Sequence, residues 1–522
     1  MSFGRLGTWL ARVVTGEPRG AIGAAAQSPR TYACGVNTNR SLVIALLASA
    51  VTHGCHAPET SRDAQVEARD DTSRRELRPV AKVEPGSARE WGELSTAPRV
   101  EIDALDKLWS NQARLHDDPE LVDEMSCAKS AFGRIVVNVG DQNGDSIDDL
   151  VLGAITAPPP WFEQAVELAD GVTGQSRFAT LDQNIDAVAR VRGDRGARDA
   201  FVVASGEHTG LSCMTIDRVR LFHGTYPVPG GELDVSSGRH RDMVWGPDID
   251  GDGDPDLLVS TDDASSSAVV LRSGVPGGLR AVIGGPMLLG SSLAAGRDLD
   301  RDGAEDLLVG PTITFGPRSV RAFSVAKRQL LAEIVPPEDA EQFGRALALV
   351  DDCNADGAPD ILIGAPYAGL DRRGFVQLYS GTSVELLHTW RGEAARASLG
   401  RAVRADADFD GDGAPDFVIT APGLGSGGPR GAVYIVSPVS GKVLLQIEGE
   451  PRDPNDPWVD MGGHDPAWFP SCHSFGWAIA TGDFNGDGIA DLAIGSPQAG
   501  TNNLVGIVYA LSGVELRKHM AR

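Results

Sequence analysis

Asp408 to Asp416 reads DFDGDGAPD and runs directly into the apolar stretch FVITAP. The nine-residue loop places aspartates at its first, third, fifth and ninth positions. Carboxylate oxygens at alternate positions can converge on one cation when the backbone turns tightly, and calcium accepts about 6–8 oxygen ligands. The stretch therefore predicts a calcium loop that leads into a buried strand.

Five further copies of this loop occur along the chain, each with Asp or Asn at positions 1, 3 and 5 and Asp at position 9. The predicted ligands are Asp141, Asn143, Asp145 and Asp149; Asp248, Asp250, Asp252 and Asp256; Asp298, Asp300, Asp302 and Asp306; Asp352, Asn354, Asp356 and Asp360; Asp408, Asp410, Asp412 and Asp416; and Asp483, Asn485, Asp487 and Asp491. We expect about six calcium ions, one for each loop. Acidic Asp-Gly turns that cap strands without a metal are the alternative.

The spacing of the loops predicts the architecture. Their first aspartates fall at 141, 248, 298, 352, 408 and 483, so the first interval is about twice the next three. That interval contains a degenerate copy, VRGDRGARD from Val191 to Asp199, which keeps the final aspartate and loses the other ligands. An arginine at its fifth position, Arg195, is expected to pair with Asp199 in place of an ion. Seven units of about 50 residues, each with room for four short strands, predict a propeller.

The strand pattern within one unit agrees with this prediction. FGRALALV from Phe343 precedes a loop, and the continuous apolar run ILIGAP follows it, as expected of a strand buried on both faces. GFVQLYSG from Gly374 and VELLHTW from Val384 supply two more strands, separated by glycine-containing turns. We expect an all-β fold, a seven-bladed β-propeller of four-stranded blades.

Short motifs on both sides of the loops carry a family resemblance. Phe343-Gly344 with Gly364-Ala365-Pro366, and Phe475-Gly476 with Gly495-Ser496-Pro497, bracket calcium loops. The chain therefore resembles FG-GAP repeat proteins, namely the seven-bladed propeller at the head of integrin alpha subunits and bacterial FG-GAP proteins. The resemblance implies that each calcium loop joins the first two strands of its blade and that the loops share one face.

Two positions depart from the repeated pattern. Leu399-Gly400 replaces Phe-Gly before the loop that begins at Asp408. Ser146 stands where the other loops have glycine, so we expect a strained backbone with positive φ and a weaker site there.

The net charge of −25 comes largely from these loops. It argues against nucleic-acid binding, because no basic stripe gathers phosphates. The loops are also unlike EF-hands, which need a glutamate at the twelfth position and flanking helices.

The N-terminal region predicts export. LVIALLASAV from Leu42 follows Arg40-Ser41 and ends near Gly54-Cys55, as in a secretory signal that is too short to span a bilayer. We interpret residues 1–55 as this signal, with a true start near residue 36, and Cys55 as a lipidation site. Residues 56–95 are polar and predict a disordered tether, and residues 96–522 predict the propeller. The protein is then an outer-membrane or cell-surface lipoprotein, or is freely secreted.

Cysteines and chain ends suggest how the ring closes. Cys127 and Cys472 precede the Phe-Gly pairs of the first and last units, so a disulfide between them would latch the ring. Cys353 is expected to remain a thiol. The strand that closes the last blade comes either from the segment Val100 to Trp109 or from the C-terminal VELRKHMAR.

An insertion at residues 449–474 concentrates aromatic side chains. Trp458 and Trp468 suit contact with a ligand, either by stacking on sugars or by anchoring a protein, and packing on the rim is the structural alternative.

The leading interpretation is a non-enzymatic, calcium-binding, exported propeller that acts as an interaction or adhesion module. Its partner would be a protein or a glycan, and any membrane contact would come only through the lipid anchor. A lectin-like carbohydrate-binding propeller is one alternative. An enzyme with a site in the central channel is another, although GxSxG, HExxH and GxxxxGK[ST] motifs are absent from the sequence.

Overall fold

A computed structural model describes most of the repeat region. The described residues are 91–112, 132–155, 163–183, 185–191, 200–208, 214–223, 226–234, 240–246, 256–261, 269–274, 278–283, 292–311, 319–327, 329–423, 431–450, 475–497 and 506–520. All of them belong to one compact unit, Arg75–Arg522. Among these residues, no helix has the length and apolar character needed to cross a membrane.

The described strands form sheets that follow one another along the chain, and their strand pairs are antiparallel except for β1 with β26, which is parallel. Three sheets have four strands in sequence order: β3 (Ile135–Gly140), β4 (Asp149–Ile155), β5 (Glu163–Ala169) and β6 (Ser176–Gln183); β15 (Leu293–Arg297), β16 (Asp306–Val309), β17 (Val320–Ser324) and β18 (Gln329–Ile334); and β19 (Ala346–Val350), β20 (Asp360–Ala365), β21 (Phe375–Tyr379) and β22 (Leu386–Arg391). Two sheets do include an N-terminal strand: β1 (Arg99–Glu101) with β23 (Val403–Ala407), β24 (Asp416–Ala421), β25 (Ala432–Val436) and β26 (Val443–Glu448); and β2 (Lys107–Gln112) with β27 (Ala478–Gly482), β28 (Asp491–Ser496) and β29 (Ile507–Leu511).

The remaining sheet has eight strands. It contains β7 (Ile185–Val191), β8 (Ala200–His208), β9 (Met214–His223), β10 (Tyr226–Asp234), β11 (His240–Gly246), β12 (Asp256–Thr261), β13 (Val269–Gly274) and β14 (Gly278–Ile283). Its two halves are joined where β11 pairs with β9 through one residue pair, His240 with Ile216.

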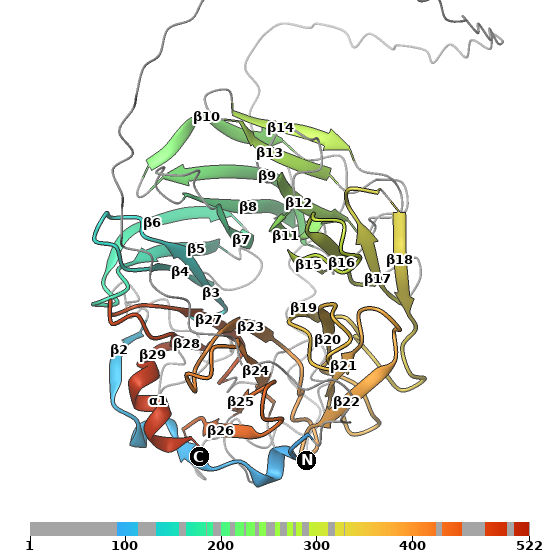
Figure 1. The fold of residues 1–522 in the computed structure, drawn as a ribbon. Coiled ribbons are helices and arrows are strands. Elements are labelled where there is room, and N and C mark those ends of the chain that lie inside the picture. Colours follow the sequence, from blue (N-terminus) through green and yellow to red (C-terminus); the bar gives the residue numbers. More distant parts are fainter. Residues whose placement is uncertain are drawn as a thin grey trace, which may run out of the picture. The chain divides into compact units, whose positions relative to one another are not determined.

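The first strands of successive repeats line the centre of a closed ring (Figure 1). Contacts run from β3 to β7, β11, β15, β19, β23 and β27, and β27 returns to β3. The molecule is therefore an all-β propeller, as predicted.

Burial differs between the inner and the outer strands of a repeat. The second strands β20, β24 and β28 are buried at every residue, which confirms the prediction from their continuous apolar runs. The outer strands β18 and β22 are partly exposed. The core therefore lies between sheets, where apolar side chains of neighbouring sheets pack together.

The Phe-Gly pairs dock each repeat on the sheet before it. Gly133, Gly344, Gly400 and Gly476 have φ between 80° and 90°. A Cβ on Gly400 would lie 2.6 Å from the carbonyl oxygen of Phe375, so neither the backbone conformation nor the space tolerates a side chain. This close approach explains why the glycine persists where leucine replaces the phenylalanine.

The N-terminal strand β2 completes the sheet of the last repeat. It pairs antiparallel with β29, from Lys107 with Leu511 to Gln112 with Ile507. Of the two segments considered from the sequence, the N-terminal one therefore supplies the closing strand. The C-terminal segment instead forms the helix α1 (Gly513–His519), with Ser512 as its N-cap.

Trp109 of β2 ties the last repeat to the first. Its side chain is 9% exposed, and its indole N–H donates to the carbonyl of Gly171, at the turn after β5, at 2.6 Å. A Cβ on Gly174 would lie 2.4 Å from the indole, so the turn wraps closely around the ring. The two ends of the chain are thus joined by strand pairing and by a buried aromatic side chain.

Residues before β1 also pack on the propeller. The short 3-10 helix η1 (Leu94–Thr96) buries Leu94, and Trp91 lies against His388, Trp390 and Phe417 at centroid distances of 5.2–6.1 Å. A second one, η2 (Ile102–Ala104), lies between β1 and β2. Packed chain therefore begins by residue 91, inside the range predicted as a tether.

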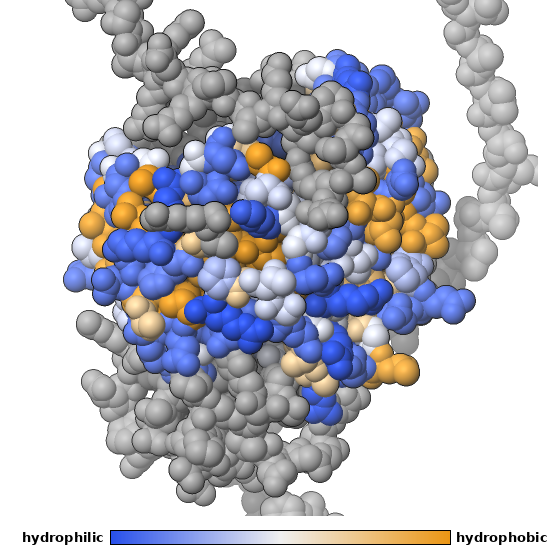
Figure 2. All heavy atoms as spheres, turned by 60° about the horizontal axis from the view of Figure 1, so that its bottom comes forward, coloured by the Kyte–Doolittle hydropathy of each residue, from blue (hydrophilic) through white to orange (hydrophobic). Residues whose placement is uncertain are grey.

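Figure 2 shows one side of the molecule as mostly hydrophilic, with hydrophobic residues in small groups. The large apolar side chains exposed among the described residues are Val172, Leu330, Val335, Leu370, Leu386 and Val514. They come from different sheets and loops.

Candidate metal centre

Five acidic loops are described in full, and each joins the first and second strands of its repeat. They connect β3 to β4, β15 to β16, β19 to β20, β23 to β24, and β27 to β28. In the 248–256 loop, Asp256 is described and is fully buried, whereas Asp248, Asp250 and Asp252 lie outside the described residues. The degenerate copy from 192 to 199, with the predicted Arg195–Asp199 pair, also lies outside them.

The carboxylate at position 1 organises the turn. In each loop it accepts a hydrogen bond from the backbone N–H of position 6: Ser146 to Asp141 at 2.8 Å, Gly303 to Asp298 at 2.7 Å, Gly357 to Asp352 at 2.7 Å, Gly413 to Asp408 at 3.0 Å, and Gly488 to Asp483 at 2.8 Å. Position 6 has positive φ throughout, including 69° at Ser146, which confirms the strained backbone expected there.

Position 4 also has positive φ, which the sequence reasoning missed. Arg301 and Ala355 have φ of 60° and 61° there, and the other described loops have glycine. Glycine at this position in four of the six loop sequences was the available signal.

The aspartate at position 9 is buried and fixed at the start of the second strand. One oxygen accepts from the backbone N–H of position 2 in all five loops, at 2.7–3.0 Å. In Asp149, Asp360 and Asp491 the other oxygen accepts from a glycine N–H after the third strand. In Asp306 and Asp416 the other oxygen has no hydrogen-bond partner among the described residues. A buried carboxylate oxygen without a donor is costly, and a bound cation would satisfy it.

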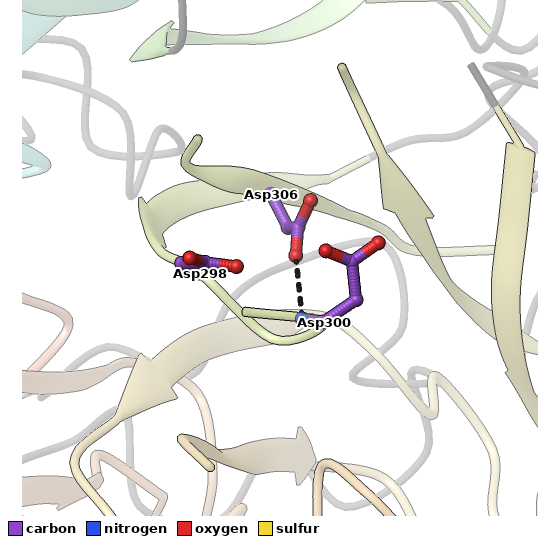
Figure 3. A group of neighbouring side chains, drawn as sticks. All are labelled: Asp298, Asp300 and Asp306. Atoms are coloured by element: carbon purple, nitrogen blue, oxygen red, sulfur yellow. Dashed lines mark hydrogen bonds between the residues drawn. The ribbon is translucent and has the colours of Figure 1, made fainter. Parts of the chain in front are cut away.

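Carboxylates at positions 1, 3 and 9 converge in two loops. Asp298, Asp300 and Asp306 bring oxygens within 4.8 Å of one another, and Figure 3 shows the three side chains around a common space. Asp408, Asp410 and Asp416 form the same triad. The donor sets contain oxygen only, which is the chemistry that calcium and magnesium prefer.

The aspartate at position 5 lies outside these triads. In all five loops one of its oxygens accepts from the backbone N–H of position 7, at 2.8–3.0 Å. This hydrogen bond holds the second half of the turn. Of the four predicted ligand positions, the structure therefore gathers three in two loops and uses the fourth to shape the backbone.

Burial raises the pKa values of several position-9 aspartates. The pKa of Asp416 reaches about 8, chiefly through burial, and the neighbouring charges of Asp410, Asp412 and Asp408 contribute to this value. Burial likewise raises the pKa of Asp306 to about 6, and of Asp360 and Asp491 to about 7. A divalent cation at the same place would favour the ionised form and lower these pKa values.

Three loops have asparagine at position 3 instead of aspartate. The amide nitrogen of Asn354 donates to Asp356, and that of Asn485 donates to Asp487, both at 2.9 Å. In the first loop Asn143 donates to Asp149 at 3.3 Å. The amide thus neutralises part of the acidic cluster, while its carbonyl oxygen remains a ligand type that calcium accepts.

Serines after the third strand support position 5, and the sequence reasoning missed them. The buried hydroxyls of Ser324, Ser380 and Ser437 donate to Asp302, Asp356 and Asp412 at 3.2, 2.9 and 3.4 Å. The available signal was the serine that ends each of these third apolar runs. Each loop is therefore braced by its own sheet.

Lys327 distinguishes the loop that begins at Asp298. Its ammonium nitrogen lies 2.9 Å from Asp300 and 3.4 Å from Asp302. The equivalent residues after Ser380 and Ser437 are serines, Ser383 and Ser440. In this loop, the ammonium group of Lys327 therefore lies against two of the predicted calcium ligands.

Other predicted sites lie mostly outside the described residues, namely Cys55, Cys127, Cys472, Trp458 and Trp468. Cys353 is described and is a buried thiol, as expected. Its S–H donates to the carbonyl of Asp351 at 3.1 Å.

Comparisons with known proteins agree with this repeat geometry. The family described as FG-GAP repeat matches residues 343–379, 399–436 and 475–511. Human integrin alpha-8 is 33% identical over 162 residues, which is 27% of this chain and 15% of the relative. Integrin alpha pat-2 of Caenorhabditis elegans is 29% identical over 178 residues, or 29% of this chain and 14% of the relative.

Among solved structures, a chain from the crystal structure of BBS1N in complex with ARL6DN, soaked with lead, aligns with a TM-score of 0.46 and 11% identity. The alignment covers 74% of this chain and 93% of that one. The integrin matches span about one seventh of the relatives' length. The three matched segments each contain one described acidic loop with its flanking strands. The chain thus contains FG-GAP repeats and is distantly similar to integrin alpha chains.

Proposed function

We propose that this chain is an exported calcium-binding propeller of seven four-stranded blades that serves as a recognition module at the cell envelope. The sequence of contacts between first strands supports seven blades, because β7 and β11 each occupy a place of their own in the ring. The eight-stranded sheet then represents two blades, since a single residue pair joins its halves. With the last two sheets completed by N-terminal strands, every blade has at least four strands.

The observation that carries the calcium assignment is the shared geometry of the loops. Five loops repeat the same hydrogen bonds from positions 2, 6 and 7, and two of them bring three carboxylates within 4.8 Å. Calcium suits such sites better than magnesium, because it tolerates irregular geometry and many protein oxygens, whereas magnesium keeps several waters. With the 248–256 loop included, we propose about six calcium sites.

Calcium would make the loop face rigid. Each loop links the two innermost strands of its blade, and an ion that binds only the folded protein stabilises it by mass action. A rigid disc with fixed loops suits recognition of a partner, a protein or a glycan, and not of nucleic acid, given the net charge of −25. The envelope location rests on the signal-like segment that ends at Cys55, where a lipid would be the membrane anchor.

Thermal unfolding of the mature chain in excess chelator, and across calcium and magnesium titrations, tests the calcium assignment. We expect the unfolding midpoint to rise with calcium in the millimolar range and to respond much less to magnesium. An unchanged midpoint in calcium would show that the acidic loops are metal-free turns.

Capture of envelope proteins on the calcium-loaded chain, with the chelated chain as control, tests the recognition role. A defined partner retained in calcium and released by chelator supports the proposal. Metabolic labelling with a fatty acid, compared between the wild type and Cys55→Ser, tests the anchor, and label that persists in the variant would refute lipidation at Cys55.

A further inference from the structure

Three arginines and a tryptophan occupy one repeated position at the end of the first strands that lies opposite the acidic loops. Arg134, Arg345 and Arg401 each follow the glycine of a Phe-Gly or Leu-Gly pair, and Trp477 does so in the last repeat. Each of these residues lies one or two positions before the first strand of its repeat, and that strand then leads to the acidic loop. Because β19, β23, β27 and β3 are successive neighbours in the ring, the four residues lie on adjacent strands at the same end of the ring.

The backbone under these side chains is held firmly. The preceding glycines dock against the neighbouring sheet with positive φ. The N–H groups of Arg345 and Trp477 donate to the carbonyls of Gly364 and Gly495, both at 3.2 Å. Because this backbone is already fixed, only the side chains would have to become ordered when a ligand binds.

Arg401 is oriented by an aromatic ring. Its guanidinium carbon lies 4.1 Å from the centroid of the Trp477 ring, which is cation–π stacking distance. In the described part of the chain, neither Arg401 nor Arg345 forms an ion pair with a carboxylate. A guanidinium stacked by its face keeps its edge N–H groups available, and that edge matches a carboxylate in two parallel hydrogen bonds.

Charges of the same sign lie close together here. Burial lowers the pKa of Arg401 well below its usual range, and the nearby charges of Arg345 and Arg134 lower it further. Asp242 of β11 accepts the N–H of Leu293 at 3.0 Å and so holds the next repeat; burial raises its pKa, which the charges of Arg345 and Arg404 partly offset. An added carboxylate would reduce the repulsion between the guanidinium groups.

Solvent reaches Arg345 freely, whereas the guanidinium of Arg401 lies deeper. Arg345 is exposed, and Arg134, Arg401 and Trp477 are half-buried. The loop after β20 adds Tyr367, whose charge state acts on Arg401, and Arg372 lies over the Tyr367 ring at 5.5 Å. Both aromatic rings therefore already have a guanidinium on one face, which favours ligands that bind arginine edges over sugars that stack on aromatic faces.

We propose that the Arg134–Arg345–Arg401 end of the channel binds an acidic segment of a partner polypeptide, with a carboxylate held between Arg345 and the Trp477-stacked Arg401. The inference rests on the proposed recognition role and names its partner chemistry. It also divides the propeller into two ends of opposite charge, with cation sites at one end of the first strands and a carboxylate site at the other.

A fluorescence-anisotropy titration of the mature, calcium-loaded chain with labelled octaglutamate tests this site. We expect saturable binding that weakens with salt, and no binding of octalysine or octaglutamine. Arg401→Gln and Arg345→Gln should each weaken octaglutamate binding about tenfold or more, because each removes a charge-assisted pair. Arg297→Gln is the matched control, since it removes the same charge near an acidic loop, where Arg297 pairs with Asp351.

Unchanged affinity in both channel variants, or an equal loss in Arg297→Gln, would overturn the site. Competition by inorganic sulfate that is as strong as competition by free octaglutamate would overturn the polypeptide assignment. The calcium-dependent unfolding midpoint of each variant shows that it is folded and loaded. It also separates failure of this site, with normal calcium stabilisation, from failure of the calcium-binding proposal itself.

Discussion

Replacing Asp416 by asparagine separates the two roles of the acidic loops. Asp416 is fully buried, and one oxygen accepts the N–H groups of Phe409 at 2.8 Å and Asp410 at 3.2 Å. An asparagine carbonyl can accept the same hydrogen bonds, and its NH₂ can donate to the neighbouring carboxylate of Asp410. The substitution therefore preserves the turn while it removes one charged ligand.

Without calcium, the negative charge of Asp416 destabilises the folded wild-type protein. The pKa of Asp416 is about 8 in the fold against 3.8 for the ordinary group, so the folded protein binds more protons than the unfolded chain between those values. The contribution of Asp416 to metal-free stability is therefore most favourable below pH 4 and becomes less favourable as the pH rises toward 8. At pH 7.5 the cost is at most ~5 kcal/mol, and at pH 5 at most ~1.6 kcal/mol, from 1.36 kcal/mol per pKa unit. Solvent and local rearrangement reduce both figures, so we expect Asp416→Asn to be more stable than wild type in chelator by about 1–3 kcal/mol at pH 7.5.

With calcium, the advantage of the variant shrinks. An extracellular-type loop with a Kd of about 10⁻⁴–10⁻³ M gains about 1.4–2.7 kcal/mol from 10 mM calcium. Asp416→Asn should lose most of that increment for its own loop. The increase in the free energy of unfolding between chelator and calcium should therefore be smaller in the variant than in the wild type by about 1–3 kcal/mol.

Urea unfolding monitored by tryptophan fluorescence, at pH 5 and 7.5 with chelator or 10 mM calcium, measures both effects once refolding is shown to be reversible. Asp351→Asn is the matched control, because Asp351 is half-exposed, pairs with Arg297 and is not a predicted ligand. If Asp416→Asn were less stable than wild type in chelator at pH 7.5 and kept the full calcium increment, the assignment of Asp416 as a cation ligand would be refuted.

Three further substitutions test other parts of the structure. Trp109→Ala should lower the free energy of unfolding by about 3–5 kcal/mol, because it leaves a cavity where the ring ends join. Trp109→Phe should lower it by about 1–2 kcal/mol, because the Gly171 carbonyl loses its donor. Equal losses for the two variants in urea unfolding would contradict these separate contributions. Lys327→Ser should tighten calcium binding at its loop about fivefold in calorimetric titration, and an unchanged isotherm would show that its ammonium does not compete with the ion. Ser146→Gly should stabilise the protein by up to ~1 kcal/mol, and Gly488→Ser should destabilise it by a similar amount, because both positions have positive φ.

Most of the fold was predictable because each repeat encodes it locally. The acidic loop, the apolar run after it and the Phe-Gly pair before it recur at a near-constant interval, and each has a direct structural cause. The positive φ at Ser146 followed from comparison with glycine in the other loops. The buried second strands followed from continuous apolar runs.

Contacts between distant segments were less predictable. The choice of β2 to complete the last sheet, and of a helix for the C-terminal segment, depends on which segment packs better once the ring is formed. Lys327 was missed because it lies 27 residues after Asp300, on another strand connection of the same sheet. Its role appears only when the sheet folds back over the loop.

The sequence alone determined that acidic turns recur with calcium-like spacing, that all-β repeats carry them, and that the chain resembles FG-GAP proteins. These features reside in single loops and strands, where residue type and spacing act over a few bonds. Tertiary structure alone decided that positions 1, 3 and 9 converge while position 5 braces the turn, and that Trp109 joins the ring ends. It also decided that arginines from separate repeats gather at one end of the channel, because closing the ring brings together first strands that are more than 50 residues apart.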